Sequence, residues 1–441
     1  MKWIPGTLAL LVLGMLLKLS LLVYAMYVLL GVLLLSRFLT RAWTDNIAAT
    51  RSCDREVVEI GEVADVEVEV ENKGRLPIPW MILEDALPRE ALVQMPARIR
   101  AEGPRLTITK LAPGGCERLA YRVTFLMRGY YQLGPLLVET GDLFGLHRHF
   151  RVTADPHFVT VLPRVLPLQG YNLASRRPIG EIRLAHRLYE DPTRIAAIRP
   201  YQPGDALNRI HWRATARTGQ LHSRVYETSC VAGATLLLDF HQASYQGSGA
   251  VASAELAVTT VASLANAVYL MGQQIGFISN GRDGADRIRQ EGWRAEFASR
   301  TAAQKRVVET GRSDRLRPVV VETRKGAGQF SRILHALARL EHTDGMTFPE
   351  MVAEAAAQLP RDATVVTVLR AVTPAIAISL GNLVRQGHAV TAVAITWDSG
   401  VAPDWARPPE WAELLLAEGV DFRQVNNEEA LINLCAEAIV R

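Results

Sequence analysis

The first forty residues contain an almost uninterrupted apolar run. Between Ile4 and Leu35 the sole charged residue is Lys18. As one helix this run would be about 48 Å long, whereas the hydrocarbon core of a bilayer is about 30 Å thick. Two arrangements remain open: a strongly tilted single span, or a transmembrane hairpin of two short helices over residues 1–40. The hairpin is favoured because its turn near Lys18 keeps that charge away from the bilayer centre.

Charges on the two flanks of the apolar run predict its orientation. Lys2 alone precedes the run, whereas four arginines follow it: Arg37, Arg41, Arg51 and Arg55. Positively charged flanks stay on the cytoplasmic side of a membrane. We therefore expect a protein of the bacterial inner membrane whose soluble domains face the cytoplasm.

Residues 50–165 alternate between apolar and polar positions in several short stretches. Residues 63–70 read V-A-D-V-E-V-E-V, and residues 106–109 and 119–125 alternate in the same way. A period of two is typical of strands with one buried face, and Pro/Gly-rich turns separate these stretches. The pattern predicts a β-sandwich domain over residues 50–165.

Residues 231–441 show a different alternation, of short apolar runs with longer helical stretches. Strands are expected at residues 234–239, 275–279, 363–369 and 389–397. Helices are expected at residues 253–271, 331–340 and 348–359. Strands that alternate with helices predict a doubly wound α/β domain.

An arginine-rich segment, residues 170–230, connects these two domains. Ten arginines and four acidic residues lie between Arg176 and Arg224, so this stretch has a net charge of +6, against +4 for the whole chain. Pro203 and Gly204 predict a tight turn, after which Asp205 can cap a helix that begins at Ala206. Such a helix would carry an arginine at every fourth position, namely Arg209, Arg213 and Arg217.

Arginines stacked in this way repel one another, so an anionic counterpart is expected. Carboxylates inside the protein, an acidic partner surface and lipid phosphate all remain open. Nucleic acid is not expected, because Trp212 is the only aromatic residue interleaved with the helix arginines.

The same segment carries a resemblance to a known family. The signature Tyr201-x-Pro203-Gly204-Asp205, followed by Arg209-Ile-x-Trp212 and Ala216-Arg217, resembles that of the bacterial domain-of-unknown-function 58 family. The apolar N-terminus and the residues 141–146 (G-D-L-F-G-L) match it as well, so the resemblance covers essentially the whole chain. It implies a C-terminal domain similar to a von Willebrand factor type A domain. It also implies a partner, a cytoplasmic MoxR-type AAA+ ATPase.

In a doubly wound sheet, ligands bind at the carboxyl ends of strands, which here directs attention to Asp239. The implied fold commonly binds a divalent cation through an Asp-x-Ser-x-Ser loop. In this chain His241 and Ala243 stand where the serines belong, and hard cations need oxygen ligands. We therefore expect a degenerate site without metal. The four scattered cysteines predict buried free thiols and neither a zinc site nor a disulfide framework.

These observations favour a protein that is not an enzyme and has no cofactor: a membrane-anchored, non-catalytic adaptor or scaffold. It would dock the ATPase or a client protein through the signature residues. The alternatives are a membrane-bound hydrolase that uses the Asp239 loop and a purely structural, envelope-associated protein. The hydrolase is disfavoured because the chain lacks a nucleophile elbow, an HExxH motif, a Walker motif and a GxGxxG motif.

Overall fold

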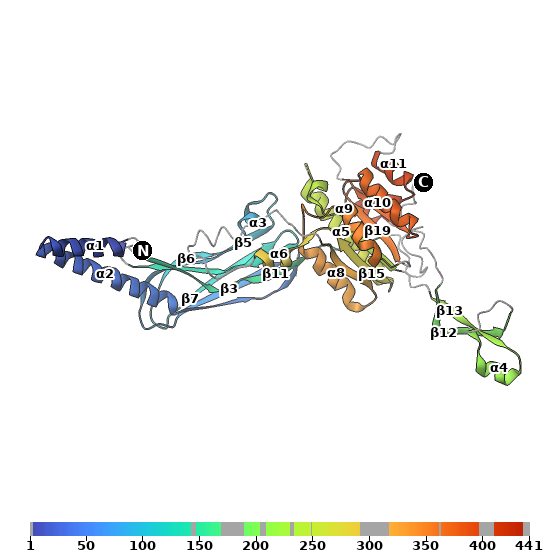
Figure 1. Ribbon diagram of the computed structural model, residues 1–441, viewed down its shortest axis with the longest axis horizontal. Helices are drawn as coiled ribbons and strands as arrows, with labels where there is room; N and C mark the ends of the chain where they lie inside the picture. Colours follow the sequence, from blue (N-terminus) through green and yellow to red (C-terminus); the bar gives the residue numbers. More distant parts are fainter. Residues whose placement is uncertain are drawn as a thin grey trace. The chain divides into compact units, whose positions relative to one another are not determined.

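A computed structural model describes the chain at residues 3–142, 147–168, 189–202, 209–229, 233–247, 249–291, 317–360, 363–396 and 410–434. The chain forms two compact units (Figure 1). The first comprises Met1–Pro163 and Gly284–Thr310, and the second comprises Arg164–Asp283 and Gly311–Arg441. The multi-domain organisation expected from the sequence is therefore present.

The apolar run forms two helices, α1 (Trp3–Leu16) and α2 (Ser20–Asp45). The chain reverses at Lys18, whose φ of 55° lies in the left-handed region. The helices contact each other at Gly14, where an added Cβ would lie 3.1 Å from the Leu22 side chain. The apolar run is thus interrupted at Lys18.

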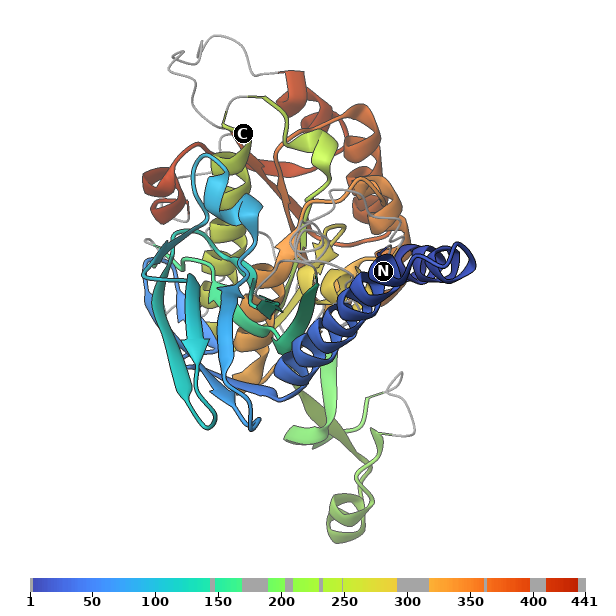
Figure 2. The ribbon, with the colours of Figure 1, turned by 90° about the vertical axis from the view of Figure 1, so that its left-hand side faces the viewer.

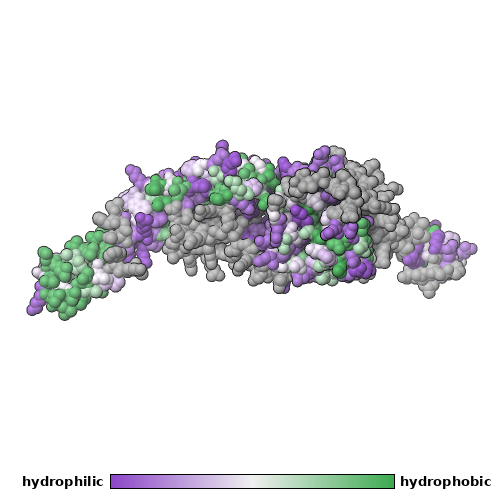
Figure 3. Space-filling model, turned by 90° about the horizontal axis from the view of Figure 1, so that it is seen from above, coloured by the Kyte–Doolittle hydropathy of each residue, from purple (hydrophilic) through white to green (hydrophobic). Residues whose placement is uncertain are grey.

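Two described helices are long and apolar enough to cross a membrane, α2 and α5 (Ala250–Leu270). The apolar window of α5 is 78% buried, as in the core helix of a soluble domain, whereas that of α2 is 11% buried. Figure 3 shows the apolar surface gathered over α1 and the first half of α2. By length and composition, these helices are weak evidence of membrane association.

The β-rich part of the first unit contains three sheets around one core. One sheet has the order β1 (Ile47–Cys53), β3 (Val63–Asn72), β7 (Cys116–Phe125), β5 (Ile99–Glu102). A second has the order β10 (Arg148–Ala154), β9 (Leu136–Gly141), β4 (Ile78–Asp85), β6 (Leu106–Leu111). The third is β2 (Val57–Glu59), β11 (His157–Leu162), β8 (Gly129–Leu133). Buried side chains from all three sheets form a single apolar cluster, as the predicted sandwich requires.

A buried polar network joins the two larger sheets of this sandwich. Arg51 on β1 forms an ion pair with Asp85 on β4, and their side chains are 4% and 0% exposed. The Tyr121 hydroxyl on β7 donates to Asp85 Oδ2 at 2.6 Å. Burial raises the pKa of the Asp85 carboxyl, against the opposing effect of Arg51 and Tyr121. The sheets are thus held together by charge as well as by apolar packing.

The second half of α2 packs on β9 and β10 of the same unit. The Ser36 hydroxyl donates to the buried carboxylate of Asp142. Next to the last residue of the helix, Thr44 Oγ1 lies 3.0 Å from His149 Nδ1. Arg151 donates to the carbonyls of Thr44 and Asp45, each at 3.1 Å, and so satisfies groups that a helix C-terminus leaves unpaired. One continuous helix therefore runs from the apolar segment onto the sandwich.

The second unit is built on a six-stranded sheet with helices on both faces (Figure 2). The order is β17 (Val319–Arg324), β15 (Gln274–Ser279), β14 (Gly233–Leu238), β19 (Ala363–Leu369), β20 (Val390–Ile395), β21 (Asp421–Val425). All pairs are parallel except that of β17 with β15. Helices α5, α8 (Ala327–Arg339) and α12 (Glu428–Ile432) pack on one face. Helices α9 (Phe348–Ala355), α10 (Pro374–Arg385) and α11 (Glu410–Ala417) pack on the other. The predicted doubly wound arrangement is confirmed.

The arginine-rich segment contains a small sheet of its own. Strands β12 (Tyr189–Pro200) and β13 (His222–Ser229) form an antiparallel pair, with helix α4 (Trp212–Thr218) between them in sequence.

Candidate functional site

Helix α4 presents the second half of the signature. Its N-cap is His211, whose Nδ1 accepts a hydrogen bond from Ala214 N at 3.0 Å. It ends at Gly219, which adopts a φ of 73° that a glycine tolerates without strain. None of its seven residues is buried, and Trp212 is 65% exposed. Two-turn helices are not stable alone in water, so α4 depends on contacts outside itself.

The predicted stripe of three arginines is wrong. Arg213 and Arg217 lie on α4, but Arg209 precedes it. The reason is a long-range contact: Ile210 is 5% exposed and forms a β-bridge with Ser223. This bridge lies between Arg209 and the N-cap His211, so the helix that carries Arg213 and Arg217 begins at Trp212 and does not include Arg209.

The signature residues differ in their surroundings. The backbone N–H of Tyr201 donates to Leu221 O at 2.8 Å, which closes the loop that carries α4. Arg213 and Arg217 are exposed, and neither forms an ion pair with a carboxylate in the described part of the chain. Three signature residues, Pro203, Gly204 and Asp205, lie outside the described residues. We call Trp212, Arg213 and Arg217 the α4 surface.

The Asp239 loop follows β14, as the sequence predicted. The Asp239 side chain is buried, and its carboxylate accepts three hydrogen bonds from the protein. Ser244 Oγ donates to Oδ2 at 2.6 Å, while Asn280 Nδ2 and His241 N donate to Oδ1 at 2.9 and 3.2 Å. The side chain of Ala243 offers no oxygen, and no cluster of three or more His, Cys, Asp or Glu suited to a metal is found among the residues that the structure describes. These hydrogen bonds hold the loop against the end of β14.

A serine, a histidine and an aspartate also meet beside α2. Ser36 Oγ lies 3.0 Å from His147 Nδ1, and Asp142 Oδ2 lies 3.7 Å from that same nitrogen. In a catalytic triad the histidine bridges its partners through opposite ring nitrogens, with serine at one and aspartate at the other. Here both partners lie at Nδ1, and Ser36 donates directly to Asp142. This cluster therefore joins α2 to the sandwich and has no nucleophilic geometry.

The described cysteines give no site either. Of the two described cysteines, Cys53 is half-buried and Cys116 is exposed, so the expected burial of the thiols is wrong for Cys116. The chain bends at Ala112–Gly115 just before Cys116, which leaves that residue at the open end of β7.

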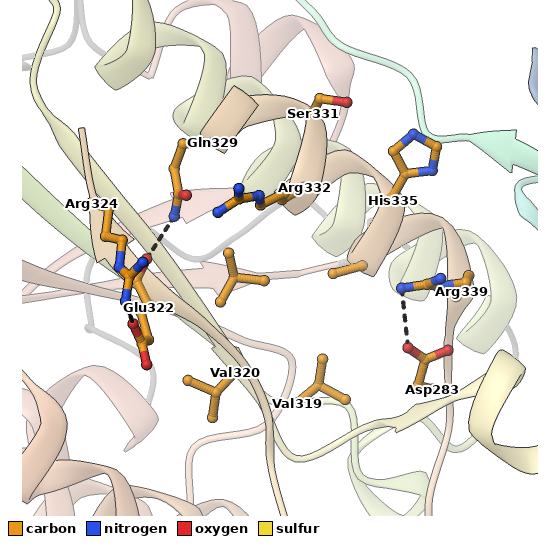
Figure 4. Close-up of a pocket in the computed structure, with 12 residues that line it drawn as sticks. Asp283, Val319, Val320, Glu322, Arg324, Gln329, Ser331, Arg332, His335 and Arg339 are labelled. Atoms are coloured by element: carbon orange, nitrogen blue, oxygen red, sulfur yellow. Dashed lines mark hydrogen bonds and ion pairs between the residues drawn. The ribbon is translucent and has the colours of Figure 1, made fainter. Parts of the chain in front are cut away.

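A groove that no sequence pattern indicated lies between β17 and α8 (Figure 4). This cavity of about 560 Å³ combines valines from the strand with cationic and polar side chains from the helix. Its lining comprises Asp283, Val319, Val320, Val321, Glu322, Arg324, Gln329, Ser331, Arg332, His335, Ala336 and Arg339. We call it the β17–α8 groove. Its residues come from separate elements, so no local motif could have revealed it.

Comparisons with known proteins add a family match. The model described as "Protein of unknown function DUF58" matches residues 197–302. The uncharacterized protein YeaD of Bacillus subtilis is 24% identical over 239 residues, which are 54% of this chain and 57% of that protein. The chain thus spans little more than half the length of this curated relative.

Similar solved structures have low scores. The CARDB domain of a Pyrococcus furiosus protein is 16% identical and covers 26% of this chain and 87% of its own, with a TM-score of 0.18. A non-cellulosomal cohesin from Archaeoglobus fulgidus is 14% identical and covers 26% and 91%, also with a TM-score of 0.18. Neither score carries an argument about function. The segment that includes the α4 surface and the Asp239 loop is the part of the chain that matches the domain-of-unknown-function 58 family.

Proposed function

We propose that this protein is a membrane-anchored, non-catalytic adaptor that docks a MoxR-type AAA+ ATPase or a client protein at the cytoplasmic face of the inner membrane. One observation carries the proposal: a two-turn helix exposes Trp212 beside two arginines and buries none of its own residues. Tryptophan and arginine are the side chains that most often dominate binding energy in protein interfaces. A partner surface with carboxylates would cover the indole and neutralise both charges.

The membrane anchor is the hairpin of α1 and α2. At 1.5 Å per residue, α1 is about 21 Å long and the exposed apolar part of α2, Ser20 to Leu35, is about 24 Å long. Both are shorter than the ~30 Å hydrocarbon core, and the flexible side chain of Lys18 at the turn extends the reach to the far interface. Arg37 and Arg41 then mark the cytoplasmic side.

The α/β domain is of the von Willebrand factor A type in this proposal. Its strands, numbered in chain order within the sheet, lie in the order 3-2-1-4-5-6 with the third antiparallel at the edge, which supports the assignment. The hydrolase alternative finds no support at Asp239, because neighbouring donors already occupy both carboxylate oxygens.

The test is capture of the ATPase from solubilised membranes by the full chain. Trp212→Ala and Arg213→Gln should each reduce capture about tenfold or more, while melting of the protein is unchanged. Arg122→Gln on β7 is a matched control, because that arginine is also exposed and loses the same charge. Equal capture by the unmodified protein and all three variants would refute the adaptor proposal. A reporter fused after Arg441 that is active only when exported should stay silent, and activity would refute the cytoplasmic orientation.

A further inference from the structure

The edge strand β17 is unprotected over half its length. In the described part of the chain it pairs with β15 alone, so its outer side carries backbone groups without a strand partner. Charged side chains and bulges discourage edge strands from pairing with other chains. Here Glu322, Arg324 and the irregular register against β15 all fall in the second half of the strand. The first half consists of three successive valines, Val319 to Val321.

Helix α8 forms the opposite wall of the β17–α8 groove and supplies a free cation. Arg339 pairs with Asp283 at 3.3 Å at one end of the groove, and Arg324 pairs with Glu322 at the other. Arg332 lies between these two pairs (Figure 4). It is exposed and forms no hydrogen bond or ion pair with any residue that the structure describes.

The charges in the groove do not balance. Three arginines face two carboxylates, which leaves one positive charge at Arg332. Burial, together with the charge of Arg339, lowers the pKa of His335, so this residue stays neutral at pH 7. This positive charge is therefore available to an anionic group from outside the groove.

The shape of the groove indicates which kind of molecule supplies the anionic group. A cavity of about 560 Å³ lies within the range of ligand-sized pockets, and its floor includes Val319, Val321 and Ala336. A free phosphate would neutralise Arg332 but leave the valines and the strand edge uncovered. An extended peptide would fill all three features, because strand addition uses the backbone edge, and alternate side chains reach the floor.

The geometry points to a docking site in the β17–α8 groove for an extended acidic segment of a partner protein, which adds as a strand beside Val319–Val321 and places a carboxylate on Arg332. The segment has alternating apolar and acidic residues. This site is separate from the α4 surface, and the inference does not rest on the adaptor proposal.

A suitable probe has the sequence of residues 63–72 of this chain, because it alternates valine with acidic residues. A fluorescent synthetic peptide of that sequence is titrated into the full chain in detergent at low salt, and anisotropy is measured. Replacing its acids by the corresponding amides should weaken binding about tenfold, since a charge-assisted hydrogen bond is lost. Arg332→Gln should weaken binding of the acidic peptide by the same factor, so that the acidic peptide and its amide counterpart bind this variant equally well. Arg385→Gln, another exposed arginine of the same domain, is the control and should change nothing.

Backbone methylation tests strand addition without changing the protein. Two further peptides carry N-methyl groups on either the odd or the even amides. In strand addition only alternate amides face β17, so one of these peptides should bind like the parent and the other should not. Equal binding of both would overturn strand addition. Unchanged binding to Arg332→Gln would overturn the site, and displacement of the peptide by millimolar inorganic phosphate alone would show a small-anion site instead.

Discussion

Removal of the Asp85 carboxylate should strongly destabilise the sandwich. Asp85→Ala leaves the guanidinium of Arg51 buried without its ion partner, and it also removes the acceptor of the Tyr121 hydroxyl. An uncompensated buried charge costs about 3–5 kcal/mol. Because whole domains are stable by only about 5–15 kcal/mol, this loss would leave the sandwich close to unfolding.

Hydrogen–deuterium exchange of the full chain in detergent reports this loss locally, which matters because a two-unit protein need not unfold in one step. Amides of β4 and β7 that exchange through opening of the domain should exchange about a hundredfold to a few thousandfold faster, at tenfold per 1.4 kcal/mol. Asp65→Ala is the matched control. Its ion pair with Arg122 is 65–70% exposed, and exposed pairs contribute little.

A double replacement separates the charge effect from simple loss of packing. Arg51→Met with Asp85→Leu removes both charges and keeps apolar volume, so it should restore most of the stability that either single change removes. Exchange in Asp85→Ala that matches the Asp65→Ala control would show that water reaches the pair, and the reasoning from burial would fail.

Three further predictions concern the second unit. Arg217→Ala should leave the melting temperature unchanged and reduce partner capture, because the exposed Arg217 has no carboxylate partner among the described residues; strong destabilisation would reveal an internal partner. Calorimetry of the full chain should show no Mg²⁺ or Mn²⁺ binding tighter than about 1 mM, since donors of the protein occupy the Asp239 oxygens; micromolar binding abolished by Asp239→Ala would contradict this. Hydrogen bonds from Thr347 lower the pKa of Glu350 below its usual 4.5, so its stabilising effect is present above that pH and is lost as pH falls through the lowered pKa. Glu350→Ala should therefore lower the melting temperature at pH 7 but not at pH 2, and an equal decrease at both would refute the capping role.

Regular elements were predictable where the pattern is local. The alternation of residues 63–70 predicted β3, in which Val66, Val68 and Val70 are buried and the glutamates between them are at least partly exposed. Continuous apolar runs gave β14, β19 and β20, because strands covered on both faces need no polar positions.

The start of α4 was not predictable from nearby residues. The Pro203-Gly204-Asp205 sequence has strong local turn and capping chemistry, yet Ile210 pairs with Ser223, thirteen positions later. Only the folded chain reveals that contact. The Asp239 loop shows the same limit. Its position was predictable, because it follows the end of β14. The hydrogen bond from Ser244 to Asp239 was not predictable, because it depends on the turn at Gln242–Ser244 that the folded chain adopts.

The continuous helix α2 fixes the rotation of its apolar first half relative to the sandwich. Its first half is exposed and apolar, while Ser36 and Thr44 lock its second half to β9 and β10 without an intervening flexible joint. Each residue of an α-helix advances about 100° around the axis. One residue inserted after Leu35 would therefore turn the apolar half by about 100° relative to the sandwich, whereas seven inserted residues would restore its direction to within about 20°. In the proposed membrane-anchored arrangement, the rotation of α2 about its axis therefore determines which side of the sandwich faces the membrane.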